Sequence, residues 1–140
     1  MGVSEEATNP PKSLLADVDG AMCPARLVLE HVTSRWGVLI LIALHERSYR
    51  FSELRRHVGR VSEKMLTQTL QTLERDGFVH RDAKPVIPPR VDYSLTPLGE
   101  EAARRVRELA RWTDQRVPEV TAARERYDAL RRETATGSSQ

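Results

Sequence analysis

The sequence predicts a mainly α-helical domain that carries one small β-hairpin. Three observations predict it. Apolar residues recur at helical spacing in several segments after residue 23, the period changes to that of strands in two short runs at 78–81 and 91–95, and three prolines lie between those runs. With 140 residues, of which 39% are hydrophobic, the chain is long enough for one domain with a modest core.

The start of the chain divides into an arm and a helix. Residues 1–20 combine Ser, Thr, Asn and Pro with four acids and one lysine, a composition typical of a flexible arm. Pro24 suits the first position of a helix, where its missing N–H group costs nothing. An amphipathic helix is expected from there to about Arg35, with one apolar face formed by Leu27, Val28, His31 and Val32.

Residues 36–44 are apolar nearly all round and predict a buried central helix. Their β-branched content leaves a buried strand as the alternative. The polar continuation His45-Glu46-Arg47 favours the helix.

Two shorter helices with capping residues follow. Ser52 is expected as the N-cap of a short helix that Gly59 stops. Ser62 is expected as the N-cap of a second helix, residues 63–76, and Gly77 fits the left-handed position after its end. Two capped helices joined by a short turn that contains glycine form a helix-turn-helix candidate.

The next segment predicts a β-hairpin. Its strands are expected at 78–81 and 91–95, where β-branched and aromatic residues are concentrated. Residues 82–90 would form a long basic tip.

A long helix is expected after the hairpin. Thr96 suits its N-cap and Pro97 its first position. Pro118 is expected to break or kink this helix, which leaves a last helix at 118–132 and a flexible tail at 133–140.

The formal net charge is only +2, but positive charge is concentrated in the middle of the chain. Residues 55–90 hold eight Lys and Arg against four Asp and Glu. A local basic patch suits a polyanionic partner, although a chance asymmetry of a solvated surface would give the same excess.

Several classes of protein find no support in the sequence. One cysteine cannot form an intrachain disulfide, no signal peptide or acyl-anchor motif is recognised, and the longest apolar run is too short to span a bilayer. We therefore expect a cytoplasmic protein with no membrane partner. No phosphate-binding loop, glycine-rich dinucleotide motif or zinc-ligand spacing is found, so we expect no enzyme activity, no catalytic residues, no cofactor and no metal.

The expected helix at 63–76 has two faces of different chemistry. Leu66, Leu70 and Leu73 form a narrow apolar stripe that would pack on the domain. The opposite face holds no acid, and its side chains are positive or carry hydroxyl or amide groups: Lys64, Thr67, Gln68, Gln71 and Arg75. Such groups can pair with base edges in the major groove, so we predict that this face reads double-stranded DNA. A plain surface helix is the alternative.

Other residues are expected to contact the DNA backbone. The N-terminus of the same helix, at Ser62, presents free N–H groups that suit a phosphate. The remaining candidates are cations that would flank the groove: Arg55 and Arg56 on the preceding helix, and Arg81, Lys84 and Arg90 on the hairpin.

Five motifs together resemble one family. They are Cys23-Pro24, Arg35-Trp36, Arg50-Phe51-Ser52-Glu53-Leu54, the stretch from Val61-Ser62 to Val79, and the stretch from Ile87-Pro88-Pro89 to Gly99. Over residues 23–112 the chain resembles the HxlR-type family of bacterial winged helix-turn-helix transcriptional regulators, which is related to the MarR group. The departures from the family pattern conserve shape or charge: Val61 for Ile, Phe78 for Leu, Ile87 for Val and Asp92 for Glu.

The resemblance implies a winged helix-turn-helix domain for DNA binding and dimerisation at residues 21–117, with the hairpin as its wing. It also implies a homodimer on a palindromic operator, whose half-sites lie about one helical turn (~10 bp) or a multiple apart. The N- and C-terminal helices would form the dimer interface, through Leu27, Val28, Val106, Leu109 and Trp112. The alternative for the apolar residues of the last helix is packing on their own subunit.

Several members of this family sense oxidants or electrophiles through a cysteine in the Cys-Pro motif and others have no known effector, so the resemblance makes Cys23 a candidate redox sensor. Pro24 would place Cys23 at or beside a helix N-cap, where the helix dipole and Arg26 favour the thiolate. A buried structural cysteine is the alternative. Two further hypotheses stay open: a small-molecule effector bound at the dimer interface, and a winged helix used for protein–protein contact.

Overall fold

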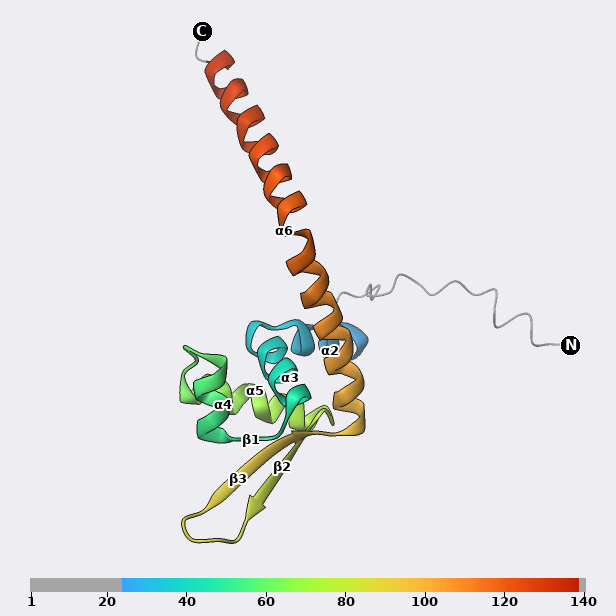
Figure 1. Ribbon diagram of the computed structural model, residues 1–140, viewed down its shortest axis with the longest axis vertical. Coiled ribbons are helices and arrows are strands. Elements are labelled where there is room, and N and C mark those ends of the chain that lie inside the picture. The colour runs from blue at the N-terminus through green and yellow to red at the C-terminus, as the bar shows by residue number, and fades with distance from the viewer. Residues whose placement is uncertain (1–23, 139–140) are drawn as a thin grey trace, which may run out of the picture.

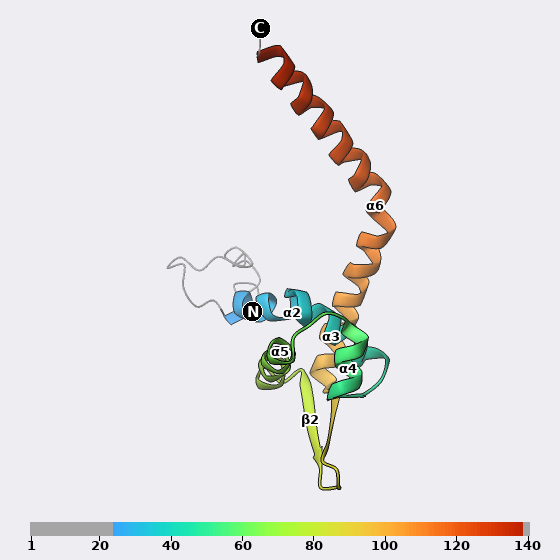
Figure 2. The same ribbon diagram turned by 90° about the vertical axis from the view of Figure 1, so that its left-hand side faces the viewer.

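A computed structural model describes residues 24–138 of the chain (Figure 1). The elements occur in the order α2 (Pro24–Thr33), α3 (Arg35–Glu46), β1 (Tyr49–Arg50), α4 (Phe51–Val58), α5 (Glu63–Arg75), β2 (Val79–Lys84), β3 (Arg90–Leu95) and α6 (Pro97–Ser138). The helices surround α3, the hairpin β2–β3 projects from one end of the molecule, and α6 leaves at the other end (Figures 1 and 2).

The central element α3 is a helix, as predicted, and not a strand. It begins where the Ser34 side chain accepts a hydrogen bond from the Gly37 backbone N–H, with a distance of 3.1 Å. A Cβ atom at Gly37 would collide with the carbonyl oxygen of His31, so only glycine allows α2 and α3 to approach this closely. The largest fully buried side chains of the domain are Ile40, Leu41, Leu54, Leu66, Leu70 and Leu73, contributed by α3, α4 and α5.

The hairpin is part of a three-stranded antiparallel sheet with the strand order β1-β3-β2. The sequence prediction missed β1, in which Tyr49 pairs with Tyr93 of β3. The ladder between β2 and β3 extends to the pair Lys84 and Arg90, so the tip is shorter than predicted and comprises residues 85–89. Both tyrosines are buried and join the sheet to the helical core.

Helix α4 begins at Phe51, two residues earlier than predicted, and its N-cap is Arg50 rather than Ser52. The Glu53 side chain accepts a hydrogen bond of 3.0 Å from the Arg50 backbone N–H. A glutamate that reaches back to the cap residue can define a helix start without a serine at the cap. Gly59 ends the helix as predicted, with a φ of 97°.

Helix α6 runs without interruption from Pro97 to Ser138 and contains Pro118. The structure therefore does not separate a helix at 118–132, and residues 133–138, which were predicted to belong to a flexible tail, continue α6. The middle of α6 bends (Figure 2), as expected where proline removes one backbone hydrogen bond and the neighbouring turns keep the helix together.

The predicted arm at 1–20 and Cys23 lie outside the described residues. Within residues 24–138, no single helix is long and apolar enough to cross a membrane, and only the bent pair α2 and α3, at 72°, reaches the required length and composition when both helices are taken together.

Candidate nucleic-acid interface

The packing of α5 determines which of its side chains face outward. Leu66, Leu70 and Leu73 are buried in the core, as the apolar stripe predicts. The Ser62 hydroxyl caps the helix by accepting a hydrogen bond of 3.0 Å from the Met65 backbone N–H. Gly77 follows the last turn with a φ of 86°, a conformation that residues with a Cβ rarely adopt. Both predicted ends of this helix are confirmed.

The outward face of α5 carries Lys64, Gln68, Gln71 and Arg75, all of them exposed. Thr67 is only half-buried and lies at the edge of this strip. The two acids within the helix, Glu63 and Glu74, border the strip on the side of Thr67, from which they are four and seven residues away. We call the four exposed side chains the α5 strip: it has two cations, two amides and no carboxylate.

Met65 lies beside the α5 strip and is 43% exposed, which the sequence interpretation missed because it looked only for polar groups. Two threonines nearby use their hydroxyls internally: Thr69 donates to the Met65 carbonyl at 2.8 Å and Thr72 donates to the Gln68 carbonyl at 3.0 Å. Because these two hydroxyls donate within the helix, hydrogen bonds from α5 to a partner would come from the side chains of the α5 strip.

The two arginines of α4 point to different surroundings. The Arg55 Nε donates to the Val61 carbonyl at 3.4 Å, so this side chain lies along the turn between α4 and α5. Arg56 instead lines a hollow with Arg47, Tyr49, Glu53 and His57. The prediction grouped them as equivalent phosphate contacts, whereas the structure brings only Arg55 next to the start of α5.

The cations of the hairpin are partly neutralised by acids of the hairpin itself. The Lys84 Nζ lies 2.7 Å from an Asp82 carboxylate oxygen, and the Arg90 Nε lies 2.9 Å from one of Asp92. The hydrogen bond from Lys84 holds the pKa of Asp82 below its usual range, and the same contact raises the pKa of Lys84. Arg81 is exposed and has no ion-pair partner within the described part of the chain.

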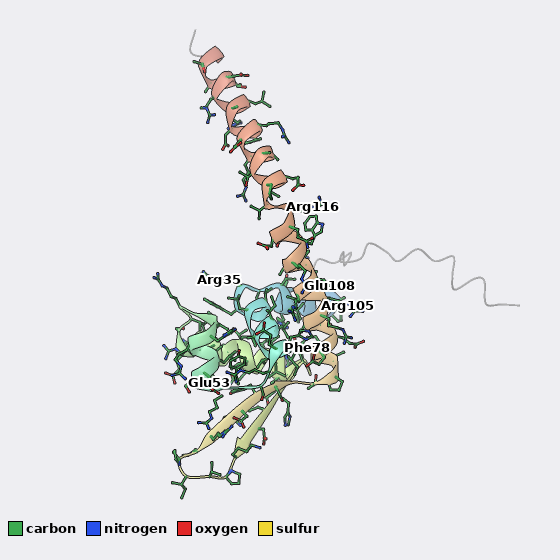
Figure 3. The ribbon with its side chains drawn as sticks, in the orientation of Figure 1. Arg35, Glu53, Phe78, Arg105, Glu108 and Arg116 are labelled. Atoms are coloured by element: carbon green, nitrogen blue, oxygen red, sulfur yellow. The ribbon has the colours of Figure 1, made fainter. Side chains whose placement is uncertain are left out.

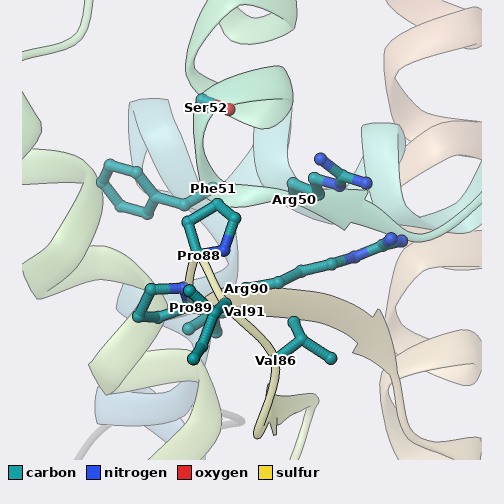
Figure 4. A pocket seen from close by; sticks show the side chains of 9 residues that line it. Arg50, Phe51, Ser52, Val86, Pro88, Pro89, Arg90 and Val91 are labelled. Atoms are coloured by element: carbon teal, nitrogen blue, oxygen red, sulfur yellow. The ribbon is translucent and has the colours of Figure 1, made fainter.

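The tip of the hairpin is apolar, a feature that the charge count did not reveal. Ile87 is 100% exposed and Val86 is 50% exposed. The tip and the start of α4 line an open hollow of about 450 Å³, whose lining includes Phe51, Pro88 and Pro89 together with Arg50 and Arg90 (Figure 4).

The first helix touches the end of α5. The His31 Nδ1 lies 2.5 Å from the Asp76 Oδ2, and Asp76 is the C-cap of α5. Next to this contact is a hollow of about 230 Å³ between α2 and α5, whose lining includes Ser34, Thr69 and Gln68. Gln68 thus belongs both to the α5 strip and to this hollow.

The residues predicted for a dimer interface fall into two groups. Leu27, Val28, Leu109 and Trp112 are exposed apolar side chains on α2 and α6. Val106 is half-buried and packs against the core of its own subunit, as the alternative interpretation expected for this helix.

Comparison with known proteins identifies the family. A profile described as HxlR-like helix-turn-helix matches residues 31–121. The chain belongs to the HxlR-like helix-turn-helix family. YtfH of Escherichia coli, an HTH-type transcriptional regulator, is 62% identical over 103 residues, which are 74% of this chain and 82% of YtfH. This membership confirms the winged helix-turn-helix fold and the class of transcriptional regulator that the motifs predicted.

Two solved structures show the same fold. The transcriptional regulator ytfH from Salmonella typhimurium is 57% identical, with a TM-score of 0.72, and the match covers 78% of this chain and 97% of that one. Diamide-treated YodB from B. subtilis is 33% identical, with a TM-score of 0.58, and the match covers 67% and 94% of the two chains.

No cluster of three or more His, Cys, Asp or Glu that could hold a metal occurs within residues 24–138.

Proposed function

We propose that this HxlR-like regulator binds double-stranded DNA with sequence preference, and that α5 enters the major groove. The α5 strip is the observation that carries this proposal: Lys64, Gln68, Gln71 and Arg75 face outward on one helix, with no acid among them. Glutamine can pair bidentately with adenine, and lysine or arginine with guanine or a phosphate. A winged helix used for protein contact would be expected to expose a mainly apolar face there.

Phosphate contacts would come from around the α5 strip. Ser62 begins the helix and leaves N–H groups of the first turn for a phosphate, and Arg81 is an exposed cation on the wing. Lys84 and Arg90 can contribute when a phosphate replaces Asp82 or Asp92 as their partner. These contacts give affinity and register, whereas the amides give sequence choice.

The test uses a duplex selected by the full-length protein from a random library. Gln68→Ala is expected to weaken binding to this duplex by about 1–3 kcal/mol and to leave binding to random DNA nearly unchanged. Gln115→Ala, an exposed glutamine on α6, is the matched control and should change neither. Binding that does not weaken as salt is raised would refute the proposal, because phosphate contacts release counterions.

A homodimer is part of the same proposal. Exposed apolar side chains on α2 and α6, among them Leu27, Leu109 and Trp112, offer surface that a second copy could cover. A two-fold dimer would present two α5 helices to successive major grooves of a palindromic operator.

We further propose that oxidation of Cys23 changes DNA affinity. Support comes from its position next to Pro24, at the start of α2, and from YodB, a relative whose structure is known after diamide treatment and in a reduced form. Diamide oxidises thiols, so it should weaken operator binding by the wild type and leave Cys23→Ser unaffected. An equal response of both proteins would assign the effect to another group.

A small-molecule effector is the second candidate, and the hollow between α2 and α5 favours it. Any ligand in this hollow would touch Gln68 and so compete with base contacts. Thr69→Trp places an indole there and is expected to weaken binding to the selected duplex. Normal binding by this variant would show that occupancy of the hollow does not control DNA affinity.

A further inference from the structure

Helix α6 continues far beyond the body of the domain. Its first turns pack on the core through Ala102, Ala103 and Val106, whereas the side chains from Arg111 to Gly137 are exposed except for Ala122 and Ala129. Figures 1 and 3 show this second half of α6, beyond Arg116, standing clear of the other helices. The match to the HxlR-like family ends at residue 121, so residues 122–138 add a helical segment to the family fold.

The exposed segment carries an apolar stripe along one face. Its large members are Leu109, Trp112, Val120, Tyr127 and Leu130, with exposed fractions of 56%, 54%, 44%, 61% and 62%. Their separations are combinations of three and four residues, and Ala123 fills the step between Val120 and Tyr127. Residues at such spacing lie above one another on a helix. Only Arg116 interrupts the stripe, and it pairs with Glu119 at 3.2 Å.

We propose that the α6 extensions of two copies of this chain pair as a short parallel coiled coil. This inference rests on the proposed homodimer. The stripe begins with Leu109 and Trp112, which belong to that proposed interface, and resumes at helical spacing beyond the bend at Pro118. In this pairing Val120 and Tyr127 occupy the a positions, and Ala123 and Leu130 occupy the d positions, of a heptad pattern.

The shape of the molecule gives the direction of pairing. The wing projects at one end and the C-terminus of α6 lies at the other (Figure 1). If the wing and α5 face DNA, the two-fold axis of the dimer stands perpendicular to the DNA axis. Both extensions then point away from the DNA and run side by side in the same direction.

Charges beside the stripe permit a parallel arrangement and do not select it over an antiparallel one. Positions that flank the d residues hold Arg124 and Arg131, which would face each other across an antiparallel pair and repel. In a parallel pair, Glu119 instead meets Arg124 of the partner subunit, and this contact is attractive. The second contact, of Arg126 with the partner's Arg131, is repulsive. An antiparallel pair would likewise bring Glu119 next to the partner's Arg126, so the direction of pairing rests on the shape of the molecule.

Cross-linking of single cysteines in the full-length Cys23→Ser protein tests the proposal. Ala123→Cys and Leu130→Cys should each form a disulfide-linked dimer in a glutathione redox buffer, since identical positions meet in a parallel pair. Glu125→Cys, on the opposite face, is the matched control and should cross-link at least tenfold more slowly. In an antiparallel pair only one position can meet its own copy, so cross-linking of just one variant would overturn the parallel arrangement.

A second measurement separates this inference from the proposed function. Tyr127→Glu with Leu130→Glu is expected to raise the dimer dissociation constant at least tenfold in sedimentation, while Thr121→Glu, off the stripe, should not. Saturating concentrations of the double variant should still bind the selected duplex. If the double variant dimerises like the wild type, the coiled coil is overturned and the proposed DNA-binding dimer is not affected. If the cysteine variants cross-link but the protein does not bind DNA, only the proposed function is overturned.

Discussion

Individual side chains of the α5 strip have different expected effects on DNA binding. Lys64 stands in the first turn of α5, beside the free N–H groups of the helix N-terminus that suit a phosphate. Lys64→Ala is therefore expected to weaken binding to specific and random duplexes alike, and to reduce the slope of log K against log salt by about one. Titrations at several salt concentrations measure both quantities.

The control for Lys64→Ala is Arg104→Ala, an exposed cation on α6 away from the α5 strip. It should leave the salt slope unchanged. A loss confined to the specific duplex would instead assign Lys64 to a base contact, as expected for Gln68.

Glu53 is the residue that defines the start of α4. Its hydrogen bond from the Arg50 backbone N–H lowers the pKa of the carboxyl below the ordinary value of 4.5, and nearby arginines add to this effect. The ionised carboxylate therefore stabilises the folded state above pH 4.5, and this contribution is lost as the pH falls through the lowered folded-state pKa.

Glu53→Ala is expected to lower Tm by a few degrees at pH 7, because the cap N–H loses its acceptor. The difference from wild type should shrink as the pH falls below the ordinary carboxyl range. Thermal melts at pH 7, 5 and 3 check this trend, and a difference that stays constant over the series would exclude the carboxylate as its source.

At the scale of one element, α5 has an inner and an outer face with separate roles. Leu70 is fully buried in the core, so Leu70→Ala should cost about 2–5 kcal/mol of unfolding free energy by leaving a cavity. Met65→Ala, on the exposed side of the same helix, should cost under about 1 kcal/mol. Chemical denaturation measures both, and equal losses would contradict the assigned faces.

The wing is a second element whose charges can be tested. Asp82→Asn removes the partner of Lys84 and frees this cation for a phosphate. Affinity for random duplex DNA should rise by roughly two- to fivefold at low salt, and the gain should vanish at high salt. Asp114→Asn on α6 adds the same charge away from the wing and serves as control; an equal gain there would indicate only an effect of net charge.

Sequence patterns predicted most elements because their signals are local. Ser62, Gly59 and Gly77 mark helix ends through their own backbone chemistry, and the leucine stripe of α5 follows directly from the helical period. The predicted start of α4 was wrong because Glu53, and not a serine at the cap, supplies the capping hydrogen bond. Strand β1 was missed because two residues cannot show alternation, and its pairing depends on Tyr93, distant in sequence.

The part of the candidate site that could be predicted is the part whose signal is local in the sequence. The outward face of α5 needs only the helical period, so four of its five predicted residues lie together on the exposed strip. The environments of Arg55 and Arg56 depend on how α4 packs. The ion pairs of Lys84 with Asp82 and of Arg90 with Asp92 had a local signal, because residues two apart in a strand lie on one face. That the two pairs lie side by side follows only from the ladder between β2 and β3.

At the scale of the whole molecule, α2 is joined to α5. The contact of His31 with Asp76 ties α2 to the C-terminus of α5, and α2 also carries the exposed Leu27 and Val28. If oxidation of Cys23 moves α2, as proposed, the contact of His31 with Asp76 is a direct route by which that movement would reach α5.

A two-fold dimer makes a geometric prediction about its operator. Both α5 helices must meet the same side of the duplex, so half-sites must be separated by about one helical turn (~10 bp) or a multiple of it. Inserting about half a turn (~5 bp) at the centre of the selected operator turns one half-site to the opposite side of the duplex. Affinity should then fall to that of a single half-site, with a salt slope about half as steep, because only one set of phosphates is contacted. Inserting a full turn keeps both half-sites on one side and is the control for added length. Unchanged affinity with the half-turn insertion would mean that the two α5 helices are not held in a rigid two-fold arrangement.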